Sequence, residues 1–434
     1  MSTTALHAVT LGVLLASLLS AGDLKFSDPA NQPPAPPAAA GYPSRDANLD
    51  ALPGFRNPPP GYGEVPFYWW QGAPLTRERL RWQLDQLKDK RISGLQINYA
   101  HSDKGGKVVG LTYPSDPPLF SESWWKLFGW FLGEARKDGA AVSLSDYTLG
   151  WPGQGYYTDE ILKDAPEIHG AALEHEAREC PSGSECIWRF GSAPLAVTAV
   201  RTDGATHIDL RGRVQDGELR WTPPVGHWRV VIVRAVPKPV SIDPMHPASG
   251  RQMIAKFYQR FEDRNPGEGG KGLNFFFSDE LSFGVRGWLW NGWFAGEFRK
   301  RKGYDVVPEL AALFVDMGPR TAKVRLDYSD VMVSLEEENF FRPLYEWHRS
   351  RGMMFGCDHG GRGLDVTEFG DYFRTQRWML APGNDQPRLT SNVIKNKVAA
   401  SIAHLYERPR TWLEGYHSSG WSTSSADVVD ATWR

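Results

Sequence analysis

The sequence predicts an α/β fold of the (β/α)8 TIM-barrel type, incomplete after the seventh strand and carrying a small inserted antiparallel β domain. Two observations predict it. Short apolar segments alternate with amphipathic helical segments, which is typical of parallel strands joined by right-handed crossovers. Four of the apolar segments also end in acidic residues. In a parallel barrel the C-terminal strand ends carry the reactive groups, so we expect one shared acidic rim.

The composition bounds the class of protein. With 434 residues, the chain is long enough for one large barrel with an insertion. The formal net charge of -2 gives no bulk electrostatic attraction for nucleic acid or an anionic membrane. The 18 tryptophans favour a protein that stacks flat apolar faces, as sugar-binding proteins do, although core packing must account for many of them. No Cys/His spacing resembles a zinc site.

The first 60 residues precede the predicted barrel. An apolar run over Val9–Ala21 is too short to span a bilayer and is followed by small residues, which predicts a signal peptide over residues 1–22. The alternatives are an uncleaved anchor or a misassigned start, because no Lys or Arg precedes the run. Residues 23–60 form a proline-rich linker. The expected location is secreted or periplasmic, without membrane association after cleavage.

Residues 61–169 form the first part of the predicted barrel. Strands are expected over Val65–Trp70, Leu95–Tyr99 and Ala141–Asp146, with helices between them that begin near Thr76 and at Ser121 or Ser123. The loop after the third strand, residues 147–157, is rich in glycine and aromatic residues. Trp151 and Tyr156 in it form either a platform for a sugar or a rigid loop packed on itself.

Residues 170–238 interrupt this alternation with short alternating segments separated by turn residues, which predicts an inserted antiparallel β domain. Cys180 and Cys186 within it have a spacing that could close a small disulfide loop in an exported protein. Cys357 lies in an apolar run and is expected to be a buried free thiol.

Residues 239–434 resume the barrel. Helices are expected around Met253–Phe261, over Trp288–Arg301 and over Thr321–Ser350. The remaining four strands are expected at 273–280, 353–359, 378–381 and 411–416. The fourth strand, LNFFFSDE, is an almost wholly apolar run that ends in two carboxylates, and such a strand is buried on both faces.

The candidate site residues lie at these strand ends. They are Asp146, Asp279, Glu280, Asp358 with His359, and Glu414. Two carboxyl groups across a sugar-sized cleft can cleave a glycosidic bond, one as a proton donor and one as an ionised base or nucleophile. Because alternate strand residues point to opposite faces, we expect only one of Asp279 and Glu280 to face the cleft, and we assign that role to Glu280. Glu280 is the predicted acid and Glu414 the predicted base, unless Glu414 only forms a surface ion pair.

The sequence resembles glycoside hydrolase family 106, the α-L-rhamnosidase type. The resemblance rests on the order and spacing of FYWWQGAPLTRERLRWQLDQLKDKRISGLQI, SDYTLGWPGQG, FFFSDELSF, EFRKRKGYDVVPELAAL, SLEEENFFRPLYEWHRSRGM and HLYERPRTWLEGYHSSGW, and covers roughly residues 65–434. It implies an inverting enzyme with Glu280 and Glu414 as the two catalytic glutamates. It also implies calcium as a candidate cofactor, with no ligands assigned, and an oligo- or polysaccharide substrate. Trp70, Trp151 and Trp421 are further candidate substrate contacts, beside the acidic residues and His359. Asp358, His359 and Asp385 are also candidates for a sugar or metal contact.

Two departures from the family pattern shape the expectations. The fifth strand ends in FGCDHGGRG, where the family tends to have a Glu-containing segment, so the sugar specificity stays open. The sequence also stops after the seventh strand, so we expect an open barrel with exposed edges. Three functions are therefore carried forward: an inverting α-L-rhamnosidase, a retaining glycosidase for another sugar, and a non-catalytic carbohydrate-binding remnant.

Overall fold

A computed structural model describes residues 53, 56, 64–70, 74–98, 116–145, 156–203, 206–359, 363–386, 393–408, 410–416, 419–420 and 422–433. The predicted signal peptide and nearly all of the predicted linker lie outside these residues. So do Asp146, Trp151 and Trp421 and the side chains of Tyr156 and Cys357. Within the described part of the chain, no helix is both long enough and apolar enough to cross a membrane.

The chain divides into two compact units. The β unit comprises Leu173–Val236 and Trp290–Ser334. The barrel unit comprises Pro33–Ala172, Pro237–Leu289 and Leu335–Arg434. All the predicted strand-end acids belong to the barrel unit, so this unit holds the candidate site.

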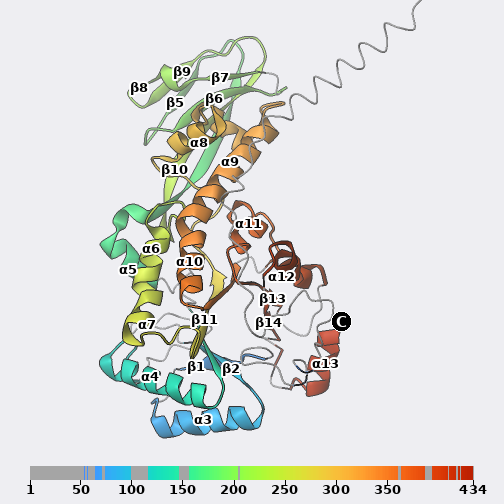
Figure 1. The fold of residues 1–434 in the computed structure, drawn as a ribbon. Helices are drawn as coiled ribbons and strands as arrows, with labels where there is room; N and C mark the ends of the chain where they lie inside the picture. The colour runs from blue at the N-terminus through green and yellow to red at the C-terminus, as the bar shows by residue number, and fades with distance from the viewer. Residues whose placement is uncertain are drawn as a thin grey trace, which may run out of the picture. The chain divides into compact units, whose positions relative to one another are not determined.

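The barrel unit is built on one parallel sheet of seven strands (Figure 1). In spatial order they are β1 (Phe67–Trp69), β2 (Gly94–Asn98), β3 (Ala141–Ser145), β11 (Leu273–Leu281), β12 (Met354–His359), β13 (Ala381–Gln386) and β14 (Trp412–Gly415). Every neighbouring pair is parallel. The sheet curves through 223°, which confirms the predicted incomplete barrel.

Helices connect the strands of this sheet. They are α3 (Arg77–Asp89), α4 (Glu122–Lys137), α5 (Tyr156–Asp164), α6 (Ser249–Met253), α7 (Gln259–Arg264), α10 (Arg342–Ser350), α11 (Tyr372–Gln376), α12 (Val393–Leu405) and α13 (Ser425–Trp433). Two π-helical turns, Ile254–Tyr258 and Glu337–Phe341, lie within helical stretches, and short 3-10 turns occur at Pro166–Ile168 and Glu368–Gly370. The side chains of Thr76 and Ser121 cap α3 and α4, as their position in the sequence predicts.

The helices cover the sheet with an aromatic core. Trp124 and Phe128 of α4 pack on Trp70, with ring centroids 6.0 and 6.2 Å away, and Phe131 lies 5.0 Å from the same ring. All four side chains are fully buried. Trp70 therefore contributes to the core and offers no exposed face on which a sugar could stack, contrary to the role that we predicted for it.

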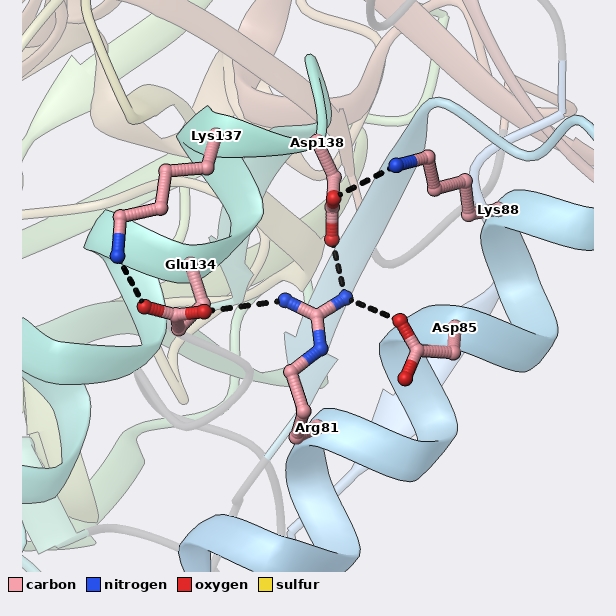
Figure 2. Close-up of polar contacts among 6 residues, drawn as sticks. All are labelled: Arg81, Asp85, Lys88, Glu134, Lys137 and Asp138. Atoms are coloured by element: carbon pink, nitrogen blue, oxygen red, sulfur yellow. Dashed lines mark hydrogen bonds and ion pairs between the residues drawn. The ribbon is translucent and has the colours of Figure 1, made fainter.

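Helices α3 and α4 lie side by side and share a polar network on their outer surface (Figure 2). Arg81 of α3 forms ion pairs with Asp138 and with Asp85 at 2.8 Å and Glu134 at 3.2 Å. Lys88 reaches Asp138 at 3.0 Å. The apolar faces of the two helices turn toward the sheet, so this network joins the layer that remains in solvent.

The β unit contains the predicted antiparallel strands. One sheet has the order β4 (His169–Pro181), β10 (His227–Ile242), β6 (Ala196–Arg201) and β7 (His207–Asp209), and the other has β5 (Cys186–Arg189), β9 (Glu218–Trp221) and β8 (Val214–Gln215). Helices α8 (Phe294–Lys302) and α9 (Thr321–Glu336) and the 3-10 turns Arg211–Arg213 and Val307–Leu313 complete the elements. Trp188, Leu219 and Trp228 are buried together in its core. A disulfide joins Cys180 to Cys186, which confirms the pairing suggested by their spacing.

Two predicted elements are misplaced. The apolar run 378–381 is not a strand over its length: β13 begins at Ala381 and continues to Gln386. Trp378 instead lies in the turn after α11 and is buried in the core. The helix predicted over Trp288–Arg301 begins only at Phe294, so the aromatic residues before it belong to a loop.

Candidate active site

The polar ends of the parallel strands gather at one rim of the sheet. The buried polar residues there are Asn98 of β2, Ser145 of β3, Asp279 and Glu280 of β11, Asp358 and His359 of β12, and Asn384, Asp385 and Gln386 of β13. Glu414 of β14, in register with Asp385, completes the group and is partly exposed. Because every strand is parallel, these ends face the same side of the sheet.

Alternation along β11 decides which carboxyl group enters the barrel interior. The rings of Phe275 and Phe277 lie 5.0 and 4.9 Å from the ring of Trp412 on β14, a strand that does not pair with β11. Phe276 points the other way, 4.8 Å from the Tyr258 ring beside α7. Asp279 shares the face of Phe275 and Phe277, so it enters the interior. The expectation that Glu280 alone faces the cleft is therefore wrong.

A β-bulge brings Glu280 to the same rim. Ser278 pairs with Cys357 and Leu281 pairs with His359, so two residues of β11 oppose the single residue Asp358 of β12. Glu280 has a φ of +48°, the left-handed region that non-glycine residues rarely adopt. Such a conformation costs about 1–3 kcal/mol and is found most often at functional sites. The bulge explains how neighbouring residues can both belong to one cluster.

Three carboxyl groups meet across the interior. Single carboxylate oxygens of Asp279, Asp358 and Glu414 all lie within 4.8 Å of one another. Glu414 also forms a hydrogen bond with Asp279. One oxygen of Asp279, Oδ1, is buried and has no hydrogen-bond partner among the described residues. Carboxylates converging on one point, with a spare buried oxygen, fit a hard divalent cation such as calcium.

The electrostatics of the cluster favour protonated forms. Burial raises the pKa of Asp279 well above its ordinary value, and Glu414, Asp358 and Glu280 raise it further. Burial likewise raises the pKa of Asp358, with added contributions from Glu414 and Asp385, while the Glu280 amide opposes the shift. A proton or a cation is therefore needed to stabilise this group of acids.

His359 does not join the acids. Its Nε2 lies 2.8 Å from the Thr375 hydroxyl, and its ring packs against Phe369 and Tyr372. Burial lowers its pKa to about 3, so the imidazole is neutral in the range where glycosidic bonds are cleaved by carboxyl pairs. Its surroundings describe a core position behind the rim.

Asn98 was not identified as a site residue from the sequence, and Asp385 was given less weight than the acids at the strand ends. Asn98 is 1% exposed and its Nδ2 lacks a hydrogen-bond partner within the described ranges. A polar residue closing the run LQIN is the signal that could have identified it. Asp385 lies inside β13 rather than after the strand, and it acts on the pKa of Asp358. The predicted strand, 378–381, begins three residues and ends five residues too early, which left Asp385 outside it.

This geometry defines a class. A parallel barrel sheet whose strand ends carry several carboxyl groups has the arrangement used by barrel glycoside hydrolases. The sequence profile of glycoside hydrolase family 106, described as alpha-L-rhamnosidase, matches residues 192–429, more than half of the chain. The chain therefore belongs to glycoside hydrolase family 106.

One solved structure supports the fold. The rhamnosidase from Novosphingobium sp. PP1Y is 14% identical, with a TM-score of 0.59 over 87% of this chain and 54% of its own length. The beta-galactosidase from the psychrophilic Marinomonas ef1 is 11% identical, with a TM-score of 0.42 and coverage of 85% and 52%. The chain thus spans about half the length of these proteins. No curated protein matches it.

Proposed function

We propose that this chain forms the catalytic part of an enzyme that hydrolyses terminal α-L-rhamnosides of oligo- or polysaccharides. The observation that carries the proposal is the acidic rim, in which single oxygens of Asp279, Asp358 and Glu414 lie within 4.8 Å of one another and Glu280 interacts with Asp279 and Asp358. Membership of glycoside hydrolase family 106 supports rhamnose as the sugar. The chain spans about half of its structural relative, so the activity is proposed for this segment rather than carried over from the whole protein.

The proposed roles follow the family pattern. Glu280 donates a proton to the leaving oxygen, and Glu414 activates a water molecule on the opposite face of the sugar, which inverts the anomeric centre. The position of Glu280 beside the carboxyl groups of Asp279 and Asp358 supports the acid role, because it places the side chain at the acidic rim. The partial exposure of Glu414 supports the base role, because water must reach it.

Calcium is the proposed cofactor. Asp279 and Asp358 would hold it, since their oxygens converge and Asp279 Oδ1 has no hydrogen-bond partner among the described residues, while Glu414 keeps the role of base. Bound there, the ion would neutralise the cluster and offer coordination positions for sugar hydroxyl groups. At about 100 times its dissociation constant, calcium should raise the free energy of unfolding by about 2.7 kcal/mol. Thermal melts with and without calcium measure this, and a response that persists in Asp279→Asn would contradict the assignment.

A retaining mechanism is the second candidate. Retaining enzymes place their two carboxyl groups about 5–5.5 Å apart, and inverting enzymes about 6.5–9.5 Å apart. The oxygens of Asp279 and Glu414 lie within 4.8 Å, which favours retention if these two form the working pair. Proton NMR of the first-formed rhamnose anomer separates the two mechanisms, because inversion yields the β anomer and retention the α anomer.

Two substrates test the roles of the glutamates. An aryl rhamnoside such as 4-nitrophenyl α-L-rhamnoside has a good leaving group, whereas a rhamnosyl disaccharide needs protonation. Glu280→Gln should lose about 100-fold or more on the disaccharide and much less on the aryl rhamnoside. Glu414→Gln should lose similar factors on both. The exposed Glu346→Gln of α10 is the control.

Equal losses on both substrates for Glu280→Gln would remove its role as the acid. Glycan binding by calorimetry without turnover in the wild type would instead favour a carbohydrate-binding remnant.

Export is proposed from the sequence alone. The apolar run Val9–Ala21 and the small residues after it support cleavage near Gly22–Asp23. N-terminal sequencing of the protein recovered from its native host tests this, and a mature chain that retains Met1 would contradict it.

A further inference from the structure

The bulge in β11 depends on one side chain of the neighbouring strand. The backbone amide of Glu280 donates a hydrogen bond to Asp358 Oδ1 at 2.9 Å. This amide belongs to the residue with the left-handed φ of +48°, where the regular pairing of β11 with β12 shifts. In a regular parallel ladder a backbone carbonyl would accept from such an amide. Here a carboxylate replaces that carbonyl.

The position of Asp358 suits this task. It is fully buried, so its orientation is fixed by packing rather than by solvent. It is also the single β12 residue that opposes both Asp279 and Glu280. A carboxyl oxygen accepts from a backbone amide whether the group is ionised or protonated, because the proton can lie on the other oxygen. The bond therefore opposes the return of Glu280 to an extended conformation, in which its side chain would follow Phe276 away from the interior.

We propose that Asp358 is a positioning residue, which holds the backbone of Glu280 in the left-handed bulge and thereby keeps the Glu280 carboxyl at the rim beside Asp279. The proposal rests on the proposed function only for the consequence, namely that a misplaced Glu280 protonates the leaving group poorly. The bulge and its hydrogen bond stand without it.

Asparagine and alanine at position 358 separate the hydrogen bond from the charge. Asp358→Asn keeps an Oδ1 that can accept from the Glu280 amide but removes the negative charge. Asp358→Ala removes both. Asp385→Asn is the matched control, because it removes a neighbouring buried charge and leaves the bond to Glu280 intact.

The first measurement is hydrogen exchange at the Glu280 amide, resolved by mass spectrometry with fragmentation of the peptide that contains it. Exchange in Asp358→Ala should be about tenfold or more faster than in the wild type. Asp358→Asn and Asp385→Asn should stay within a few-fold of the wild type. Equal protection in wild type and Asp358→Ala would overturn the proposal, whether or not the protein hydrolyses rhamnosides.

The second measurement is turnover of the rhamnosyl disaccharide. Displacement of a reacting group by about 1 Å can lower turnover about 100-fold, so Asp358→Ala should lose that factor mainly in kcat, and Asp358→Asn about tenfold or less. Equal losses in the two variants overturn positioning. Turnover is measured with calcium in excess, because Asp358 is also a proposed calcium ligand. If Asp358→Ala does not fold, retained or lost turnover in Asp358→Asn decides alone.

A wild type that hydrolyses no rhamnoside but shows the predicted exchange pattern would remove the proposed function while leaving the positioning role supported.

Discussion

The barrel unit contains two buried sets of acidic side chains whose electrostatic surroundings are opposite. Glu337, in the π turn after α9, lies 2.6 Å from the guanidinium groups of both Arg374 and Arg377 and accepts from the Trp378 indole at 3.1 Å. At the rim, burial raises the pKa of Asp279. The other contributions come from the carboxyl groups of Glu414, Asp358 and Glu280, which also raise it. The side chains of Glu337 and Asp279 are both almost fully buried.

The difference distinguishes a carboxyl group that is buried as part of the core from one that is buried at a reactive site. Burial raises the pKa of Glu337, and the two arginines act in the opposite direction, which keeps the carboxylate compatible with the core. Buried charges in cores are paired in this way because an isolated one is strongly unfavourable. The rim instead gathers like charges, which reduces stability and produces the shifted pKa values that proton transfer or metal binding requires. Substitutions in the two groups should therefore change stability with opposite signs.

The largest effect is expected at the paired group. Glu337→Gln removes the negative charge and leaves Arg377 and Arg374, 3% and 14% exposed, without their counterion. Loss of one partner of a buried ion pair lowers the free energy of unfolding by about 3–5 kcal/mol. Urea denaturation followed by fluorescence measures the loss. Glu346→Gln, in an exposed pair with Arg342, is the control and should change it by less than about 0.5 kcal/mol.

The rim should respond in the opposite direction. Asp279→Asn removes one of several clustered negative charges, so without calcium the variant should be more stable than the wild type by about 1 kcal/mol. Its rhamnoside hydrolysis should nevertheless fall about 100-fold or more. Thermal melts in a chelator and initial rates of the same samples test both halves. A destabilised variant would mean that Asp279 has a compensating partner, and the comparison between the two groups would fail.

The sequence predicted the rim but not its internal geometry. Alternation of apolar and helical segments was enough for the parallel sheet, and acids closing apolar runs located Asp279, Glu280, Asp358 and Glu414. The bulge at Glu280 was not predictable, because its left-handed backbone is occupied by a residue that disfavours it and is stabilised by an acceptor 78 positions away. The direction of Asp279 required the packing of Phe275 and Phe277 on Trp412, a contact between distant strands.

The misplaced strand shows the other limit. The run Trp378-Met379-Leu380 is apolar and reads as a strand, but these side chains are buried through a turn after α11. The true strand, APGNDQ, contains proline, glycine and three polar residues, all of low strand propensity. It is a strand because β12 and β14 pair with it on both sides, which is a tertiary effect.

Glu336 is a third buried carboxyl group, and its raised pKa predicts that the stability of the fold depends on pH. Glu336 is fully buried beside Glu337, and neither of its carboxylate oxygens has a hydrogen-bond partner within the described residues. Burial raises its pKa well above 4.5, Asp243 and Glu337 raise it further, and Arg374 opposes them. The folded protein thus keeps a proton that the unfolded chain loses above about pH 4.5, so the stabilisation from this proton is complete below that pH and declines as the pH rises.

Glu336→Gln should remove this decline. The variant should match the wild type near pH 4 and exceed its stability increasingly at higher pH, with a difference that grows by at most about 1.4 kcal/mol per pH unit. Urea midpoints across the pH range give the difference directly. Asp279 and Asp358 contribute similar slopes, but they are present in both proteins and cancel. A constant difference at all pH values would show that Glu336 is ionised in the fold and has a partner.

The smallest effect is expected at the surface, where acids are also paired but water screens them. Arg81 is 27% exposed and bridges Asp85, Glu134 and Asp138 between α3 and α4 (Figure 2). Arg81→Met keeps the apolar stem and removes the charge. It should lower the free energy of unfolding by about 1 kcal/mol, because ion pairs that water partly reaches contribute little even in a network.

Salt distinguishes this network from the Glu337 group. In about 1 M NaCl the loss caused by Arg81→Met should shrink toward zero, since the Debye length falls to about 3 Å, whereas the loss from Glu337→Gln should persist. Arg342→Met of α10, which removes the exposed ion pair with Glu346, is the matched control. A contrary result would be a loss of more than about 2 kcal/mol in the free energy of unfolding of Arg81→Met that salt does not reduce. The network would then behave like a buried ion pair, and solvent exposure would not explain the difference between the two groups.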